Sequence, residues 1–247
     1  MPVLFSLGSL HIYSFGAMVA LGVFLSLQLM TRRAARDGFP QVTEVADLLF
    51  ITVFMGFIGS RIHYVLQNWQ WYIERPLEIF HIWEGGLIFY GGVIAAMASL
   101  VIYMRFKKIP LLKGYDFLFP YLALSHAFGR LGCFLNGCCY GRPCELPWAT
   151  HFPGLPGPVH PTQIYEAVLD GLLYLFLSRT YSRKRYDGQI IALYFVFYGM
   201  IRFVVEIFRA DNPEWNGLTF NQWISLAFIL SGALTHFFAS RKKGQVL

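Results

Sequence analysis

The sequence carries little charge. Asp, Glu, Lys and Arg make up 14% of its 247 residues, whereas a typical soluble domain carries about 25%. Hydrophobic residues reach 56% and aromatic residues 18%. This balance argues against a soluble fold and predicts an integral membrane protein. No long polar stretch separates the apolar runs, so we expect residues 1–247 to form a single membrane domain.

Features of secretory leaders and repeat proteins are also missing. The first apolar run has no charge, no basic segment before it and no small-residue cleavage site after it, so we expect a retained helix rather than a signal peptide. No internal repeat is strong enough to indicate an inverted-repeat transporter. No tract of low complexity is present.

Seven apolar runs have about the length, ~20 residues, that a helix needs to cross hydrocarbon. They cover residues 11–30, 48–66, 86–104, 115–135, 162–178, 188–207 and 221–239. The sequence therefore predicts an all-α polytopic protein with seven transmembrane helices.

The basic residues indicate an orientation. Every second connection is basic, with Arg32, Arg33, Arg36, Arg105, Lys107, Lys108, Lys113, Arg179, Arg183, Lys184, Arg185, Arg241, Lys242 and Lys243. The opposite connections hold Arg75, Arg142 and Arg209 alone. Positive charge collects on the cytoplasmic side, so we expect the N-terminus outside and the C-terminus inside. The net charge of +6 then reflects orientation and attraction to anionic lipid, and no nucleic-acid partner is expected.

Three arginines, Arg61, Arg130 and Arg202, lie inside apolar runs near their outer ends. An arginine at the bilayer centre costs roughly 2.5–3.5 kcal/mol on insertion scales, which makes each one a candidate functional residue. The guanidinium fork suits two-point hydrogen bonding to phosphate. The alternative is that each side chain reaches the interface with no ligand. Three arginines at one depth favour a pocket for an anionic lipid.

Helical spacing groups further polar residues. Tyr198, Arg202, Glu206 and Arg209 share one face, as do His126, Arg130 and Cys133, and as do Gln163, Glu166 and Asp170. Glu206 is placed to pair with Arg202, either as part of a site or as a structural ion pair. These stripes predict an inward-facing cavity open to the outer leaflet.

The outer connection 67–85 predicts a short interfacial helix. It contains Trp69, Trp71, Tyr72 and Trp83, residues typical of a membrane interface, together with Pro76. After it, Gly85-Gly86 and Gly91-Gly92 flank Tyr90. These glycines indicate either close helix packing or room for a lipid headgroup beside the Tyr90 phenol.

The four cysteines, Cys133, Cys138, Cys139 and Cys144, follow the spacing Cys-x4-Cys-Cys-x4-Cys. This spacing matches no zinc-binding pattern, and we expect no metal. Facing an oxidising compartment, two of them could form a disulfide. They could also be free, line a site, supply a thiol nucleophile or take part in redox chemistry.

Together, several of these segments resemble the prolipoprotein diacylglyceryl transferase family. They are Gly129-Arg130-Leu131-Gly132, Asn136-Gly137 with Gly141, Trp83-Glu84-Gly85-Gly86 with Gly91-Gly92, His160-Pro161-Thr162-Gln163 with Tyr165-Glu166, and Arg202-Phe203-x-x-Glu206-x-x-Arg209. The resemblance implies a catalytic domain that moves a diacylglyceryl group from phosphatidylglycerol to the lipobox cysteine of a bacterial prolipoprotein. It implies a location in the bacterial inner membrane and no cofactor. The implied partners are phosphatidylglycerol, the prolipoprotein and the bilayer.

The resemblance also assigns roles. Arg130 is expected to hold the headgroup, and Arg202, oriented by Glu206, to lie near the scissile bond. Asn136 and Gly141 are expected to shape the headgroup site, His160 and Glu166 its outer rim, and Arg61 is a weaker binding candidate. Tyr90 takes the catalytic position where many members have a histidine base, and a phenol ordinarily titrates near 10.

The sequence departs from the common family pattern at three further positions. Cys133 replaces a frequent asparagine, Cys138 a glutamate and Phe15 a tyrosine. Two other functions remain open on the residues alone. One is a membrane thiol–disulfide oxidoreductase that uses the cysteines, and the other is a transporter of an anionic solute.

Overall fold

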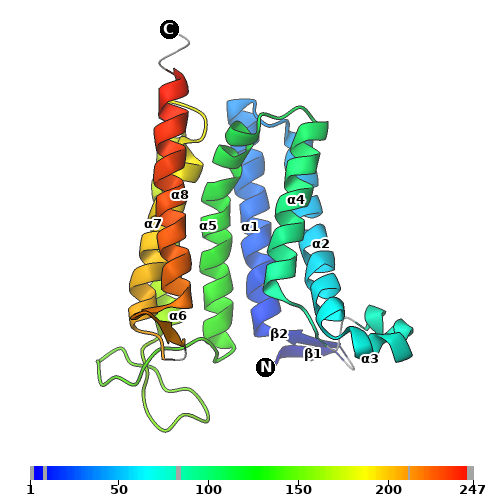
Figure 1. Cartoon of the computed structure of the whole chain (residues 1–247), viewed down its shortest axis with the longest axis vertical. Helices are drawn as coiled ribbons and strands as arrows, with labels where there is room; N and C mark the ends of the chain where they lie inside the picture. Colours follow the sequence, from blue (N-terminus) through cyan, green and yellow to red (C-terminus); the bar gives the residue numbers. More distant parts are fainter. Residues whose placement is uncertain (1–2, 8–9, 82–84, 211, 244–247) are drawn as a thin grey trace. The chain divides into compact units, whose positions relative to one another are not determined.

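The computed structural model describes residues 3–7, 10–81, 85–210 and 212–243, and helices dominate them. Seven helices of this part have 18 residues or more, and each overlaps most of one of the predicted apolar runs (Figure 1). They are α1 (Ser14–Asp37), α2 (Val42–Gln67), α4 (Phe89–Phe106), α5 (Leu111–Leu135), α6 (Thr162–Tyr181), α7 (Gln189–Ile207) and α8 (Phe220–Lys243). The all-α class is confirmed.

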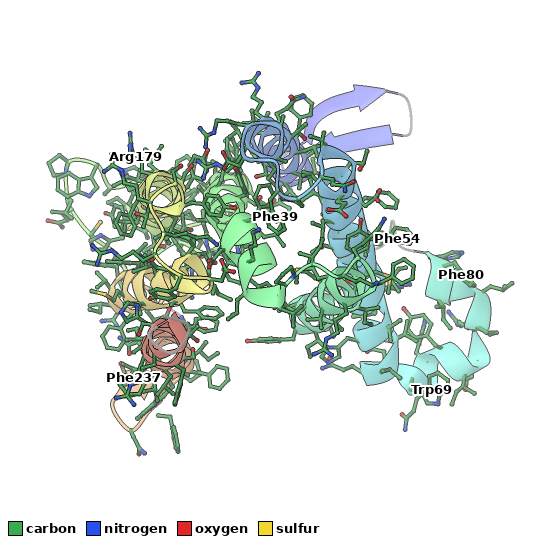
Figure 2. All side chains as sticks on the ribbon, turned by 90° about the horizontal axis from the view of Figure 1, so that it is seen from above. Phe39, Phe54, Trp69, Phe80, Arg179 and Phe237 are labelled. Atoms are coloured by element: carbon green, nitrogen blue, oxygen red, sulfur yellow. The ribbon has the colours of Figure 1, made fainter. Side chains whose placement is uncertain are left out.

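The apolar character of these helices confirms a membrane protein. Helices α1, α2, α7 and α8 are each long and apolar enough to cross a membrane, yet only 11–39% of their apolar windows is buried. Large side chains such as Phe54 on α2 and Phe237 on α8 are about half exposed (Figure 2). Helices that are apolar on all sides and remain uncovered require a lipid environment.

Several boundaries differ from the apolar runs. Helices α1 and α8 continue past their runs through the basic residues at their ends, because a helix need not stop where the hydrocarbon does. Before α1, strand β1 (Val3–Leu7) pairs antiparallel with β2 (Leu10–Tyr13), so a hairpin replaces the expected first helical turn. Its β-branched and aromatic residues favour this extended form.

The chain forms two compact units. The first contains residues 1–28 and 115–247, and the second residues 29–114. In the second unit, α2 and α4 pack through glycines. A Cβ on Gly59 or Gly91 would meet the backbone carbonyl of the other at 2.5 Å, and one on Gly92 would lie 2.9 Å from the Gly56 carbonyl. Gly91 and Gly92, next to Tyr90, therefore serve close helix packing.

The connection after α2 contains the short helix that the sequence predicts. Helix α3 (Trp69–Glu74) is followed by a 3₁₀ turn, η1 (Pro76–Phe80). Trp69 and Trp71 are more than half exposed, as expected for residues at a membrane interface (Figure 2). Trp83 and Glu84 of the predicted motif lie outside the described residues.

In the first unit, α7 packs against both α6 and α8 (Figure 1). Gly199 and Gly232 let α7 and α8 approach, because a Cβ at either would lie within 2.8 Å of the other helix's backbone. After α7, β3 (Glu214–Trp215) and β4 (Leu218–Thr219) form a hairpin. Its turn is Asn216-Gly217, both with positive φ, which is the preferred two-residue hairpin turn.

Candidate active site

A buried carboxylate joins two of the three intramembrane arginines. Glu166 on α6 is 1% exposed. Its Oε1 lies 2.9 Å from Arg130 Nη2 on α5, and its Oε2 lies 3.4 Å from Arg202 Nη1 on α7. Because α5 and α7 end where α6 begins, the three side chains meet at one end of the unit. The expected convergence of Arg130 and Arg202 is therefore present in the structure.

Arg202 has a second carboxylate. Its Nη2 lies 2.9 Å from Oε2 of Glu206, one turn further along α7, which confirms the predicted pair. Arg209 Nε lies 3.9 Å from the same oxygen. We call Arg130, Glu166, Arg202 and Glu206 the arginine–glutamate cluster. Its carboxylates are almost fully buried, whereas the Arg130 side chain is 23% exposed and Arg202 13%.

The two arginines differ in their remaining donors. A guanidinium carries five N–H groups. Both end nitrogens of Arg202 face carboxylates, but the Glu166 ion pair engages Arg130 through Nη2 alone. Arg130 is therefore better placed to bind a further anion, and Arg202 is held in a fixed orientation.

Glu206 is positioned by residues that no sequence motif indicates. Its Oε1 accepts hydrogen bonds from Thr219 Oγ1 at 3.0 Å, from Asn221 Nδ2 at 2.9 Å and from Asn212 Nδ2. The hairpin β3–β4 brings Thr219 and Asn221 back to the end of α7. The Asn216-Gly217 dipeptide is the signal that could have located this turn.

The loop between α5 and α6 is tied to the end of α7. Gly141 N donates to His160 O at 2.9 Å, and Arg142 N donates to Phe208 O at 2.8 Å. A Cβ on Gly141 would lie 2.8 Å from both His160 Cβ and Thr162 Cγ2, and it would also collide with the Phe208 carbonyl. Only glycine fits here, so Gly141 sets how closely the loop approaches the cluster.

Gly141→Ala is accordingly expected to destabilise the protein by about 1–3 kcal/mol, the usual cost of overpacking. The measurement is the thermal unfolding midpoint of the detergent-solubilised protein. Gly157→Ala is the matched control, since Gly157 lies in the same loop and a Cβ added there would meet no atom within 4 Å. Equal midpoints for the two variants would contradict the packing argument.

His160 lies beside the cluster rather than in it. Its Nδ1 is 3.2 Å from the Tyr165 hydroxyl, which also accepts a hydrogen bond from Trp148 Nε1 at 2.8 Å. His160, Tyr165 and Trp148 line a cavity of about 340 Å³ whose other walls are Leu146, Leu169, Val204, Val205 and Phe208. The cavity is apolar and aromatic, which suits a hydrocarbon group.

Glu166 differs from the sequence-based expectation. The resemblance placed it with His160 at the outer rim, but it is buried between Arg130 and Arg202. The physical reason is charge: two guanidiniums in an apolar bundle require an anion between them, and Glu166 is the carboxylate that α6 presents to both. Asp170, one turn further, is also fully buried and has no hydrogen-bond partner among the described residues.

Asn136 and three cysteines follow the end of α5. The Asn136 Oδ1 atom is buried with no hydrogen-bond partner in the described part of the chain. The four cysteines are free thiols. Hydrogen bonds from Cys133 and Cys138, together with the Arg209 guanidinium, lower the pKa of the Cys139 thiol to about 5, against the effect of burial. Burial raises the pKa of Cys138.

Arg61 has a structural environment of its own in the second unit. Its Nε donates to Ile79 O at 2.9 Å, and its two end nitrogens donate to the carbonyls of Glu78, His81, Gly85 and Gly86 at 2.8–3.4 Å. These five bonds engage every guanidinium nitrogen, so they support a structural role and not the proposed phosphate contact. Tyr90, at the start of α4, is 55% exposed. Its catalytic role, like phosphate binding by Arg61, stays a prediction.

Arg61→Ala is expected to lower the free energy of unfolding by roughly 2–4 kcal/mol, because several carbonyls of the 78–86 segment lose their donor. Thermal unfolding again measures the effect. Arg75→Ala is the control, since the Arg75 ion pair with Glu78 is exposed and worth less than about 1 kcal/mol. A loss no larger for Arg61→Ala than for Arg75→Ala would show that the Arg61 bonds contribute little.

The chain is similar to known proteins over nearly its whole length. The sequence profile described as prolipoprotein diacylglyceryl transferase matches residues 2–238. A phosphatidylglycerol–prolipoprotein diacylglyceryl transferase of Bordetella parapertussis is 36% identical over 252 residues, covering 97% of this chain and 95% of that protein. The enzymes of the same name from Clostridium tetani and Pasteurella multocida are each 37% identical, covering 94% and 93% of this chain and 94% and 86% of their own lengths. The chain belongs to the prolipoprotein diacylglyceryl transferase family.

Proposed function

We propose that this chain transfers the diacylglyceryl group of phosphatidylglycerol to the thiol of a lipobox cysteine in bacterial prolipoproteins. The observation that carries the proposal is the arginine–glutamate cluster, where Arg130 keeps donors for an anion while Arg202 is held by two carboxylates. Family membership does not favour the oxidoreductase or the transporter.

The reaction suits this geometry. The acceptor sulfur forms a bond to the terminal glyceryl carbon, the bond from that carbon to the phosphate oxygen breaks, and glycerol phosphate leaves with the bonding electrons. The thiol proton passes to a base or to the departing phosphate. Negative charge grows on the phosphate during this step, and fixed guanidiniums stabilise growing charge without reorganising. Arg130 is assigned to the headgroup phosphate and Arg202 to the scissile bond.

Other residues are assigned supporting roles. Glu206 orients Arg202, and Glu166 holds both arginines at the separation that the phosphate requires. Asn136 and Gly141 shape the loop above the cluster, with His160 at its edge. The apolar cavity between α6 and α7 is suited to hydrocarbon from either substrate. Phosphatidylglycerol, the prolipoprotein and the bilayer are the proposed partners.

The topology belongs to the same proposal. We propose seven membrane-spanning helices with the N-terminus outside. The basic connections and the seven long helices of the described residues support this topology. The cluster then lies at the outer end of α5, α6 and α7, the face on which exported prolipoproteins arrive. The proposed location is the bacterial inner membrane, and the proposed catalytic domain is the whole chain.

The direct test is to incubate the purified protein with phosphatidylglycerol and a synthetic lipobox peptide, and then to weigh the peptide by mass spectrometry. The expected product is the peptide carrying one diacylglyceryl group, with glycerol phosphate released in equal amount. A peptide whose cysteine is replaced by serine is the control and should not gain mass. An unmodified cysteine peptide with a folded protein would contradict the proposal.

Tyr90→Phe is expected to slow transfer by less than about tenfold. Phenols are weak bases at neutral pH, so the contribution of Tyr90 should fall below the roughly 10²–10⁴-fold range of a positioned general base. The initial rate of peptide modification measures this effect. Complete loss in a variant with an unchanged unfolding midpoint would instead make the Tyr90 hydroxyl the essential proton acceptor.

A further inference from the structure

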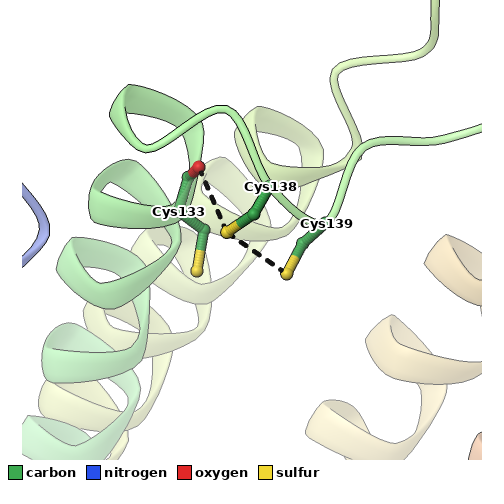
Figure 3. Close-up of side chains that lie close together, drawn as sticks. All are labelled: Cys133, Cys138 and Cys139. Atoms are coloured by element: carbon green, nitrogen blue, oxygen red, sulfur yellow. Dashed lines mark hydrogen bonds between the residues drawn. The ribbon is translucent and has the colours of Figure 1, made fainter. Parts of the chain in front are cut away.

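Three of the four thiols converge at the end of α5. Cys133 lies in the last turn of the helix, and Cys138 and Cys139 follow in the loop (Figure 3). The three Sγ atoms all lie within 4.8 Å of one another, and those of Cys138 and Cys139 are 3.6 Å apart. We call these residues the thiol cluster. Cys144, the fourth cysteine, is not part of it.

The backbone of the thiol cluster is fixed by contacts outside it. Gln163 Nε2 donates to the Cys138 carbonyl at 2.6 Å, and Thr162 Oγ1 donates to the Cys139 carbonyl at 2.9 Å. Cys139 adopts a positive φ of 67°, which residues other than glycine rarely adopt. The first turn of α6 thus holds two adjacent thiols in a conformation that directs both toward Cys133.

A positive side chain borders the thiol cluster. The Arg209 guanidinium contacts the Cys139 thiol. Thiolates, not thiols, are the ligands of soft metal ions. No acidic group joins the thiol cluster among the described residues, so a cation placed there meets sulfur ligands alone.

We propose that Cys133, Cys138 and Cys139 form a binding site for a zinc ion. Zinc–sulfur bonds of about 2.3 Å at tetrahedral angles separate the sulfurs by about 3.8 Å. The Cys138 and Cys139 sulfurs are 3.6 Å apart and no pair of the three exceeds 4.8 Å, so binding requires the more distant sulfurs to approach by at most about 1 Å. Each thiol releases one proton as the metal binds, and three protein ligands leave the fourth coordination position for water or another thiol.

The spacing of the ligands explains why the sequence pattern did not indicate a metal. Familiar zinc motifs place two cysteines on one turn, with about two to four residues between them. Here the first ligand comes from a helix end, and the other two are adjacent in the chain. Adjacent side chains normally diverge, and the positive φ of Cys139 brings these two together.

The test is metal binding by the full-length protein in detergent, independent of transfer activity. A chelator first removes any bound metal from the protein, and the reductant is then removed under anaerobic conditions. The protein is next titrated with Co²⁺, a coloured substitute for Zn²⁺. We expect one equivalent per chain, with a sulfur-to-cobalt charge-transfer band that Zn²⁺ abolishes. Cys144→Ser is the matched control and should bind as the unchanged protein does. Cys139→Ser, and separately Cys138→Ser, should lose stoichiometric binding and the charge-transfer band.

Three results would overturn the proposal. One is the absence of stoichiometric binding by the folded, fully reduced protein, a result that needs no variant. Another is an undiminished band in both Cys138→Ser and Cys139→Ser. The third is an intact mass of the anaerobically purified chain that is lower by two hydrogens, with peptide mapping that places a disulfide within the thiol cluster.

Discussion

Glu166→Gln should reduce the rate of diacylglyceryl transfer at least about hundredfold. The substitution keeps the shape of the side chain but removes the charge that faces both Arg130 Nη2 and Arg202 Nη1. Removing one partner of a buried ion pair commonly costs about 3–5 kcal/mol, and here two guanidiniums lose their shared anion. We expect them to repel each other, so that neither reaches the lipid phosphate correctly.

The measurement is the initial rate of lipobox-peptide modification at saturating phosphatidylglycerol. Asp170→Asn is the matched control, because Asp170 is buried one turn away on the same helix but pairs with no arginine in the described structure. We expect it to lose less than about tenfold. Unfolding midpoints of both variants separate loss of stability from loss of activity. Equal rates for the two variants would contradict the proposed role of Glu166 in holding Arg130 and Arg202.

Much of the fold follows from the sequence because hydrocarbon imposes a simple rule. A helix that crosses it needs a continuous apolar run, and every long helix overlaps most of such a run. The rule is silent about segments outside the hydrocarbon. The hairpin β1–β2 and the extension of α1 to Asp37 depend on local propensity and on water, so the apolar runs could not locate them.

The candidate site shows a similar division. Helical spacing correctly paired Arg202 with Glu206, since residues four apart share a face. Spacing within one helix cannot say which face meets another helix, so it did not place Glu166 between Arg130 and Arg202. Nor could it show that Arg61 donates to backbone carbonyls, because those carbonyls belong to a loop whose path the sequence does not specify.

The second large effect is expected at Arg130. Arg130→Ala should lower kcat/KM for phosphatidylglycerol at least about hundredfold. The substitution removes the guanidinium whose N–H donors outside the Glu166 ion pair are assigned to the lipid phosphate. Arg130→Lys should recover only part of this loss. Lysine restores one positive charge beside Glu166, but an ammonium cannot hold a carboxylate and a phosphate in the fixed directions that a planar fork provides.

The comparison of these two variants separates charge from geometry. If charge alone mattered, Arg130→Lys would match the unchanged protein; if the fork matters, it falls between that protein and Arg130→Ala. Arg142→Ala is the control, because Arg142 lies on the nearby loop and is exposed, with its Nε donating to the Arg209 carbonyl. Full activity of folded Arg130→Ala would show that Arg130 is not needed to bind the lipid headgroup. The phosphate would then have to bind elsewhere, and Arg202 with Arg209 would be the next pair to test.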